Sequence, residues 1–442
     1  MNLISNNLNV DKGAYRAAKG SIFLLIVLYF VELVFNIMGS PLGQNSTYKI
    51  FLVLSFGAAF YIYLITFVII SSGRFSHTSL MVSVVTTLTL LIGFINQWYL
   101  TDIVGDALRF FAPLLAYFVG IKLFKKLNID QIKIVFMRIM KGLSIIVLFN
   151  LFIKLFSMLF LGEPLVKYPN GGVDVPILLV SFFIVAWFYI KKPSISFSFF
   201  IIFIALLFIM NPIISASKAA LITVAATVIF IPLFFGKFRH KFGAVIFISL
   251  GTLLIVSSEL GMLLIGRFEV LLQLILNTET TSNVKDGSSF ARLIELQSAI
   301  DGLMKSDFFP LSILFGSGSG SLWYSSVDIG TGLNSENFRN DGGAHHIHIE
   351  LVSLLFRHGL LGLFIYLGWM FYIFKKSLYV FKYYYKKDIF LMSIAAAVAL
   401  QMLTAFLGML TDTSIYGHFT VGLISAIPVV LYSQIKLLHN NI

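Results

Sequence analysis

Apolar runs of about 20 residues recur along the chain from Ser21 to the C-terminus, and polar segments separate them. A run of this length crosses the hydrocarbon core of a bilayer as a helix, because each helical residue adds about 1.5 Å. The pattern predicts an all-α, polytopic integral membrane protein with about 12 transmembrane helices. The predicted spans cover residues 21–38, 50–70, 79–97, 103–123, 143–161, 175–190, 195–210, 213–235, 242–257, 349–374, 389–409 and 415–434.

One long polar segment, residues 257–347, interrupts this pattern, because its apolar density falls while Gly, Ser, Asn and Asp become frequent. It divides the chain into residues 1–256 with spans one to nine, a large loop, and residues 348–442 with spans ten to twelve. Within the loop, residues 290–303 have the apolar spacing of a helix, and residues 316–320 (GSGSG) predict a flexible turn. We expect the loop to carry the chemistry.

Composition and charge agree with this topology. The chain is 58% hydrophobic and only 12% charged, which excludes an ordinary soluble globular protein. Lys and Arg concentrate in alternate connecting segments, so the positive-inside rule places both termini in the cytoplasm and the large loop outside. The net charge of +12 therefore reflects topology, and no nucleic-acid partner is predicted. The chain contains no Cys, which excludes disulfides and thiolate metal sites.

Charged residues within the predicted spans are candidates for structural or functional roles, because lipid tolerates them poorly. Asp106 and Arg109 are spaced i, i+3 and predict a pair on one helix face. The alternative is that Arg109 faces a cavity for an anionic lipid. For Glu32 and Lys154 we expect a structural pair or side chains that reach the membrane surface.

Several cations are predicted on the outer side of the membrane. Lys218 stands at the outer start of a span, where an anionic ligand and a lipid headgroup are both open as partners. Arg267, Arg292 and Arg339 belong to the large loop. If this loop folds over the membrane, these side chains converge on a site suited to phosphate, which Arg binds through two parallel hydrogen bonds.

Three histidines, His345, His346 and His348, form the densest group of titratable residues in the sequence. A metal site, a general base and a hydrogen-bonded helix N-terminus are the alternatives for them. No HExxH or paired-carboxylate pattern accompanies them, so no metal is predicted. His348 precedes the helix that re-enters the bilayer, and it is the member best placed as a base.

The spacing around His348 resembles a family signature. His348 and the next residue are followed by nine residues and then by Gly359-Leu-Leu-Gly362. This resembles the His-(Asn)-x9-Gly-x-x-Gly pattern of the bacterial O-antigen ligase and O-antigen polymerase superfamily. The chain departs from that pattern at Ile349, where the family usually has Asn.

Further matches lie upstream. Ser217-Lys218-Ala219-Ala220 is similar to a Ser-Arg-small segment of the family, with Lys in place of Arg. Arg267 and Arg292 are similar to its two loop arginines, and Pro310 followed by Gly316-Ser-Gly318 is similar to its Pro-x-Gly-x-Gly stretch. The departures at residues 218 and 349 favour a polymerase over a ligase.

The resemblance implies a GT-C-like fold and an inverting, metal-independent glycosyltransferase that polymerises repeat units of O-antigen or capsule. Its donor and acceptor would be undecaprenyl-diphosphate-linked oligosaccharides in the bacterial inner membrane, with the active site in the periplasm. It implies no cofactor, and a chain-length regulator as a protein partner. His348 would be the catalytic base, and Lys218, Arg267 and Arg292 would bind the diphosphate.

Other readings remain open. Arg109, Arg339, His345 and His346 are further candidates for substrate binding, and Trp323, Tyr324 and Asn337 for sugar contacts. An O-antigen ligase that transfers glycan to lipid A core is the first alternative function. A polysaccharide transporter or flippase is the second.

Overall fold

The computed structural model describes a little over half of the chain. The described residues are 77–161, 174–214, 226–237, 241–243, 245, 287–324, 343–344, 347, 349–409 and 419–440. The predicted spans 21–38 and 50–70 lie outside them, as does most of the predicted span 242–257.

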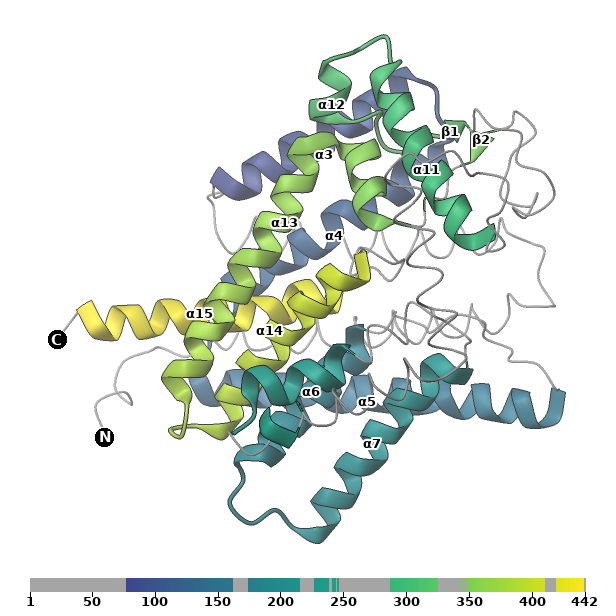
Figure 1. Ribbon diagram of the computed structural model, residues 1–442. Coiled ribbons are helices and arrows are strands. Elements are labelled where there is room, and N and C mark those ends of the chain that lie inside the picture. The colour runs from purple at the N-terminus through teal and green to yellow at the C-terminus, as the bar shows by residue number, and fades with distance from the viewer. Residues whose placement is uncertain are drawn as a thin grey trace.

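The described residues are mostly helical (Figure 1). The elements are α3 (His77–Ile95), α4 (Leu100–Phe124), α5 (Ile129–Leu161), α6 (Asp174–Tyr189), α7 (Ile195–Ile214), η1 (Ile231–Phe235), α11 (Gly287–Met304), α12 (Leu311–Phe315), β1 (Trp323–Tyr324), β2 (Gly343–Ala344), α13 (Glu350–Tyr384), α14 (Ile389–Met409) and α15 (Phe419–Asn440). Figure 1 shows α3, α11, α12 and the two short strands near one end of α13, with α5, α6 and α7 toward its other end.

Within the described residues, four helices are long and apolar enough to cross a membrane. They are Asp102–Phe124 of α4, Glu350–Tyr384, Ile389–Met409 and Val421–His439 of α15. Four shorter apolar helices, Leu80–Ile95, Ile177–Tyr189, Ile195–Ala205 and Ala226–Phe235, accompany them. The prediction of a mostly helical chain with several helices of membrane-spanning length is confirmed for the described residues.

The centre of the helical bundle is α14, which packs against α13, α6 and α15. Its residues 394–400 are fully buried, and four of them are Ala, which lets neighbouring backbones approach closely. Helices α4 and α15 also meet through small residues. A Cβ atom on Gly422 would lie 2.1 Å from the Pro113 carbonyl oxygen, and one on Gly120 would lie 2.7 Å from the Ala426 Cβ. These close approaches hold α4 against the bundle.

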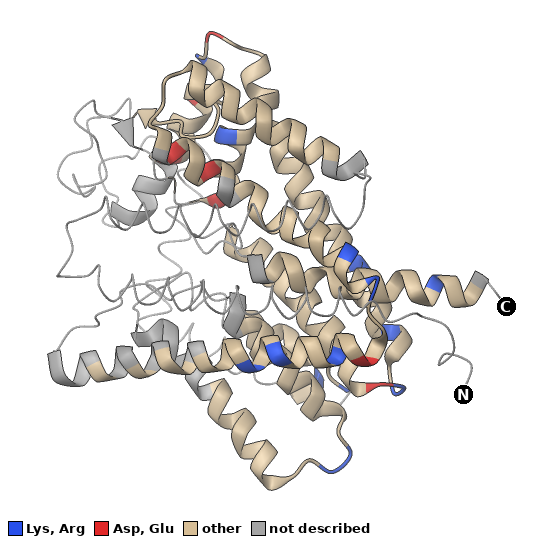
Figure 2. Ribbon diagram, turned by 180° about the vertical axis from the view of Figure 1, so that it is seen from behind, with Lys and Arg blue, Asp and Glu red and all other residues tan. Residues whose placement is uncertain are grey.

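Two helices extend beyond the apolar runs that predicted them. Helix α5 begins at Ile129 rather than at residue 143, because Asn128 and Gln131 cap it reciprocally through backbone N–H groups at 2.8 and 3.1 Å. Helix α13 continues to Tyr384 instead of residue 374. Both extensions are basic, and Lys133 of α5 pairs with Asp388 at 2.6 Å. Figure 2 shows these Lys and Arg residues along helices whose surroundings are otherwise largely uncharged.

Candidate functional site

Most of the predicted site residues lie outside the described residues. These are His345, His346, His348, Lys218, Arg267 and Arg339. Arg109 and Arg292 belong to α4 and α11, but their side chains are outside the described part of the structure. Whether these eight residues come together therefore stays a prediction.

The chain on both sides of His348 is nevertheless described. Strands β1 and β2 pair antiparallel, with Tyr324 opposite Gly343. Ile347 is buried and packs in one cluster with Trp323 and Phe356. Ile349 then forms the N-cap of α13. The structure thus places Ile347 in the core beside the small sheet and Ile349 at the start of α13.

The GSGSG segment, predicted as a flexible turn, has four of its five residues buried, with Ser317 partly exposed. Gly316, Gly318 and Gly320 have φ angles of +79°, +90° and +83°, a region that favours glycine. A Cβ atom on Gly318 would lie 2.7 Å from the backbone nitrogen of Gly93 in α3. The composition indicated a turn correctly, but the packing fixes this turn between helices.

Three backbone hydrogen bonds tie this segment to three helices. The Ser317 N–H donates to the Phe356 carbonyl in α13 at 2.7 Å, and the Ser319 N–H donates to the Thr89 carbonyl in α3 at 2.9 Å. The Gly320 N–H donates to the Asp106 carboxylate in α4 at 2.8 Å. The segment therefore links the chain between α12 and β1 to α3, α4 and α13.

Helix α13 kinks where the glycine segment reaches it. Gly359 has φ +64° and ψ −171°, which interrupts the helix. A Cβ atom there would lie 2.3 Å from the backbone of Leu314 and 2.5 Å from the Gly316 nitrogen. At Gly362 a Cβ atom would lie 2.3 Å from the His358 Cβ. Both glycines after His348 in the sequence pattern are thus required by close packing.

A buried ion pair joins α4 to α13 beside this kink. Nε of Arg357 lies 2.8 Å from Oδ2 of Asp106, and the side chains are 3% and 0% exposed. Arg357 also contacts the Ser353 hydroxyl. Asp106 was predicted to pair with Arg109 on its own helix, and the structure gives it a partner on another helix. Sequence reasoning missed Arg357, although its charge inside the predicted span 349–374 was a signal.

His358 is buried next to this ion pair. Its ring stacks on Phe110 with centroids 4.3 Å apart, and its Nδ1 lies 3.3 Å from the Thr89 hydroxyl oxygen. It is 0% exposed, so it packs the kink against α3 and α4 and has no access to solvent. No role was predicted for His358 from the sequence, because the cluster at residues 345–348 is the denser group of histidines.

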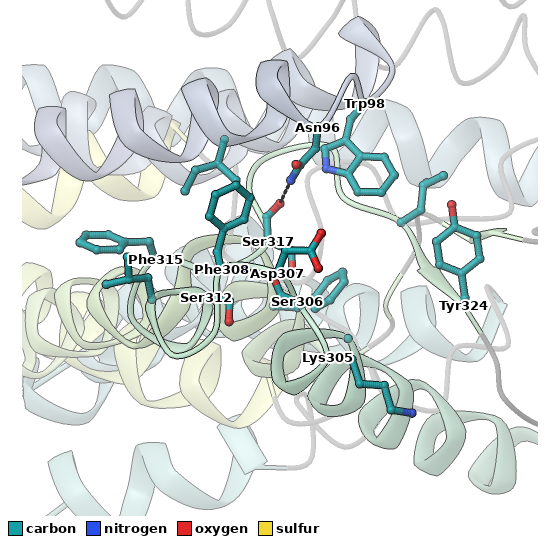
Figure 3. Close-up of a pocket in the computed structure, with 16 residues that line it drawn as sticks. Asn96, Trp98, Lys305, Ser306, Asp307, Phe308, Ser312, Phe315, Ser317 and Tyr324 are labelled. Carbon is teal, nitrogen blue, oxygen red and sulfur yellow. Dashed lines mark hydrogen bonds between the residues drawn. The ribbon is translucent and has the colours of Figure 1, made fainter.

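A pocket of about 530 Å³ opens beside the glycine segment (Figure 3). Its walls come from the end of α3 and the following turn, from α11 and α12, and from β1. They include Asn96, Trp98, Lys305, Ser306, Asp307, Phe308, Ser317 and Tyr324. Tyr324 is 49% exposed and lines the pocket, whereas Trp323 is 3% exposed and belongs to the core. The burial of Trp323 disfavours it as a sugar contact, and Asn337 lies outside the described residues.

A second pocket, of about 570 Å³, lies among α3, α4, α13 and α15. Apolar and aromatic side chains dominate its walls, among them Leu114, Phe118, Phe364 and Trp369. Its walls also include Lys125, Ser433 and two tyrosines, so both pockets combine apolar and aromatic surface with polar groups.

In the described ranges, no group of three or more His, Cys, Asp or Glu residues is placed to hold a metal ion. The three clustered histidines lie outside those ranges. No protein-family model matches the chain, and no curated protein matches it either.

Proposed function

We propose that the chain is a polymerase of O-antigen or capsular repeat units, a glycosyltransferase of the GT-C type. The observation that supports this most is the contact between two separate parts of the resemblance. Gly359, from the pattern that begins at His348, packs against Gly316, from the glycine-rich stretch of the outer loop. Two of the segments that made the sequence resemble this superfamily thus pack against each other.

In the proposed reaction, a hydroxyl oxygen of the acceptor sugar attacks the anomeric carbon of the donor glycan. His348 accepts the hydroxyl proton as a general base. The bond between the anomeric carbon and the diphosphate oxygen breaks, and undecaprenyl diphosphate leaves with the electron pair. Attack from the opposite face inverts the anomeric centre. The growing chain is transferred to the non-reducing end of a new lipid-linked repeat unit, and neither metal nor cofactor enters the scheme.

The leaving diphosphate requires positive charge nearby. Lys218, Arg267 and Arg292 have this role in the proposal, with Arg109, Arg339 and the histidines at 345 and 346 as further substrate contacts. Fixed cations stabilise charge that develops on a leaving group, and in a partly dry site this effect is worth several kcal/mol.

The proposed setting is the bacterial inner membrane, with 12 spans, cytoplasmic termini and a periplasmic loop of residues 257–347 between spans nine and ten. The flanking parts are residues 1–256 and residues 348–442. The basic extensions of α5 and α13 favour this orientation, because Lys and Arg prefer the cytoplasmic side. Membrane lipid and a chain-length regulator protein are the proposed partners besides the two substrates.

Surface lipopolysaccharide of a deletion strain tests this function. We expect the deletion to leave core that carries a single repeat unit, and the wild-type gene to restore the ladder of long chains. His348→Ala should not restore it, whereas His439→Ala, a change at an exposed position near the end of α15, should. Bare core with accumulated lipid-linked polymer would identify a ligase, and an unchanged ladder would point to transport.

A further inference from the structure

We propose that the pocket formed by α3, α11, α12 and β1 is a saccharide-binding site for an uncharged sugar of the lipid-linked repeat unit. The assignment of that sugar to a repeat unit rests on the proposed function, whereas the chemistry of the pocket stands by itself. The volume of about 530 Å³ is in the range of pockets that hold small organic ligands, roughly 300–1,000 Å³.

The walls of the pocket combine the two kinds of group that a sugar needs. Asp307, Ser306 and Tyr324 supply hydrogen-bonding oxygens, while the rings of Trp98 and Phe308 supply apolar surface. A sugar ring has hydroxyl groups at its edge and C–H groups on its faces. Carboxylate and hydroxyl oxygens accept hydrogen bonds from the edge, and aromatic rings cover the faces.

The placement of charge selects against an anionic ligand. In Figure 3 the Asp307 carboxylate points into the pocket, toward the side where Trp98 and Tyr324 lie. The Lys305 side chain, just after the end of α11, points away, and its Nζ lies 3.5 Å from the Asp301 carboxylate of that helix. A phosphate would meet a negative charge here and no inward-pointing Lys, so a neutral polyhydroxyl compound fits better.

The polar side chains of this pocket select against a lipid tail. The pocket among α3, α4, α13 and α15 is lined mainly by apolar residues such as Leu114, Phe364 and Trp369, which suits a hydrocarbon chain. The pocket beside Asp307 has hydrogen-bonding groups that a hydrocarbon chain would leave without partners, and burying such groups is costly.

The position of the pocket connects it to the proposed base. Tyr324 in its wall pairs with Gly343 across the small sheet. His348 follows Gly343 by five residues, a length of chain that spans at most about 18 Å. Ser317 and Phe356, which join the glycine segment to α13, line the other side. A sugar bound here is therefore close to the histidine segment.

Direct binding tests this site. The purified full-length chain in detergent is titrated with repeat-unit oligosaccharide that is released by mild acid from the host's surface polysaccharide. We expect Asp307→Asn to weaken binding at least about tenfold, because a charged acceptor makes stronger hydrogen bonds than an amide. Asp301→Asn is the matched control, since this carboxylate lies on α11 outside the pocket, and it should bind as the wild type does.

A second variant gives an independent measure. Oligosaccharide should quench tryptophan fluorescence in the wild type. Trp98→Phe should abolish most of this quenching, because Trp98 is the tryptophan found among the described residues that line the pocket. Inorganic phosphate should not compete. Equal affinities of wild type and Asp307→Asn, equal losses in both Asp variants, or competition by phosphate would overturn the proposal, as would a wild type that binds no oligosaccharide.

These outcomes separate the pocket from the proposed function. Oligosaccharide binding that depends on Asp307, in a protein whose deletion leaves the surface ladder unchanged, would keep the saccharide site and remove the polymerase. A deletion that loses the ladder, with wild-type binding in Asp307→Asn, would keep the polymerase and remove this site.

Discussion

Replacing Arg357 by Met removes one partner of the buried ion pair and leaves the Asp106 carboxylate buried without a cation. The two side chains are 3% and 0% exposed, so water cannot take the place of the guanidinium. Breaking a buried pair from one side costs about 3–5 kcal/mol, because an uncompensated charge remains. We expect Arg357→Met to lower the free energy of unfolding by about this amount.

The double variant Asp106→Leu with Arg357→Met separates the two contributions. Replacing a whole buried pair by apolar residues is often nearly neutral. Here it also removes the acceptor of the Gly320 N–H, which lies 2.8 Å from the carboxylate, and an unsatisfied buried donor costs about 1–3 kcal/mol. The double variant should therefore be more stable than Arg357→Met alone.

The matched control is the Lys133–Asp388 pair, whose side chains are 29% and 25% exposed. An exposed pair contributes only about 0–1 kcal/mol, so Lys133→Met should have a small effect. Equilibrium unfolding in mixed micelles, followed by fluorescence, measures all the variants. Equal costs for Arg357→Met and Lys133→Met would refute the reasoning, as would a double variant that is no more stable than Arg357→Met.

Two further predictions concern the glycine signature and the proposed diphosphate contacts. Gly359→Ala should lower the free energy of unfolding by at least about 2 kcal/mol and abolish chain elongation. The reason is that its φ is +64° and its Cβ atom would overlap the Leu314 backbone. Gly368→Ala on the same helix has open space and should be tolerated. Normal long chains in Gly359→Ala would contradict this. Arg292→Lys should slow elongation at least about tenfold in membranes, since Lys keeps the charge and loses the bidentate fork, while Lys305→Ala should have little effect; similar rates in the two variants would argue against a diphosphate role for Arg292.

Hydropathy predicted helices best where the apolar run and the helix end together. The predicted span 389–409 coincides with α14, whose start is fixed because the Asp388 carboxylate accepts the Leu391 N–H at 3.0 Å. The apolar runs are shorter than the helices at α5 and α13, because hydropathy detects residues that suit lipid and not residues that continue a helix into water. Lys and Arg end an apolar run, yet they are good helix formers.

The local packing around α13 shows the corresponding limit for the site. The spacing of Gly359 and Gly362 was visible in the sequence, whereas their need to be Gly comes from the backbone of Leu314 and the side chain of His358. The charge of Arg357 was visible too, but its partner Asp106 is far away in the chain, so only the folded structure connects them. Composition described residues 316–320 as a turn without revealing that most of them are buried.

Polymerisation by the purified protein is the most direct test of the proposed polymerase function. The chain is reconstituted in liposomes with lipid-linked repeat unit as the sole substrate, in the presence of a chelator, and the products are separated by size. For the wild type we expect a ladder of longer lipid-linked glycans with release of undecaprenyl diphosphate. For His348→Ala we expect unchanged repeat unit. Unchanged repeat unit with active, correctly folded wild-type protein, or an equal ladder from His348→Ala, would contradict the proposed function.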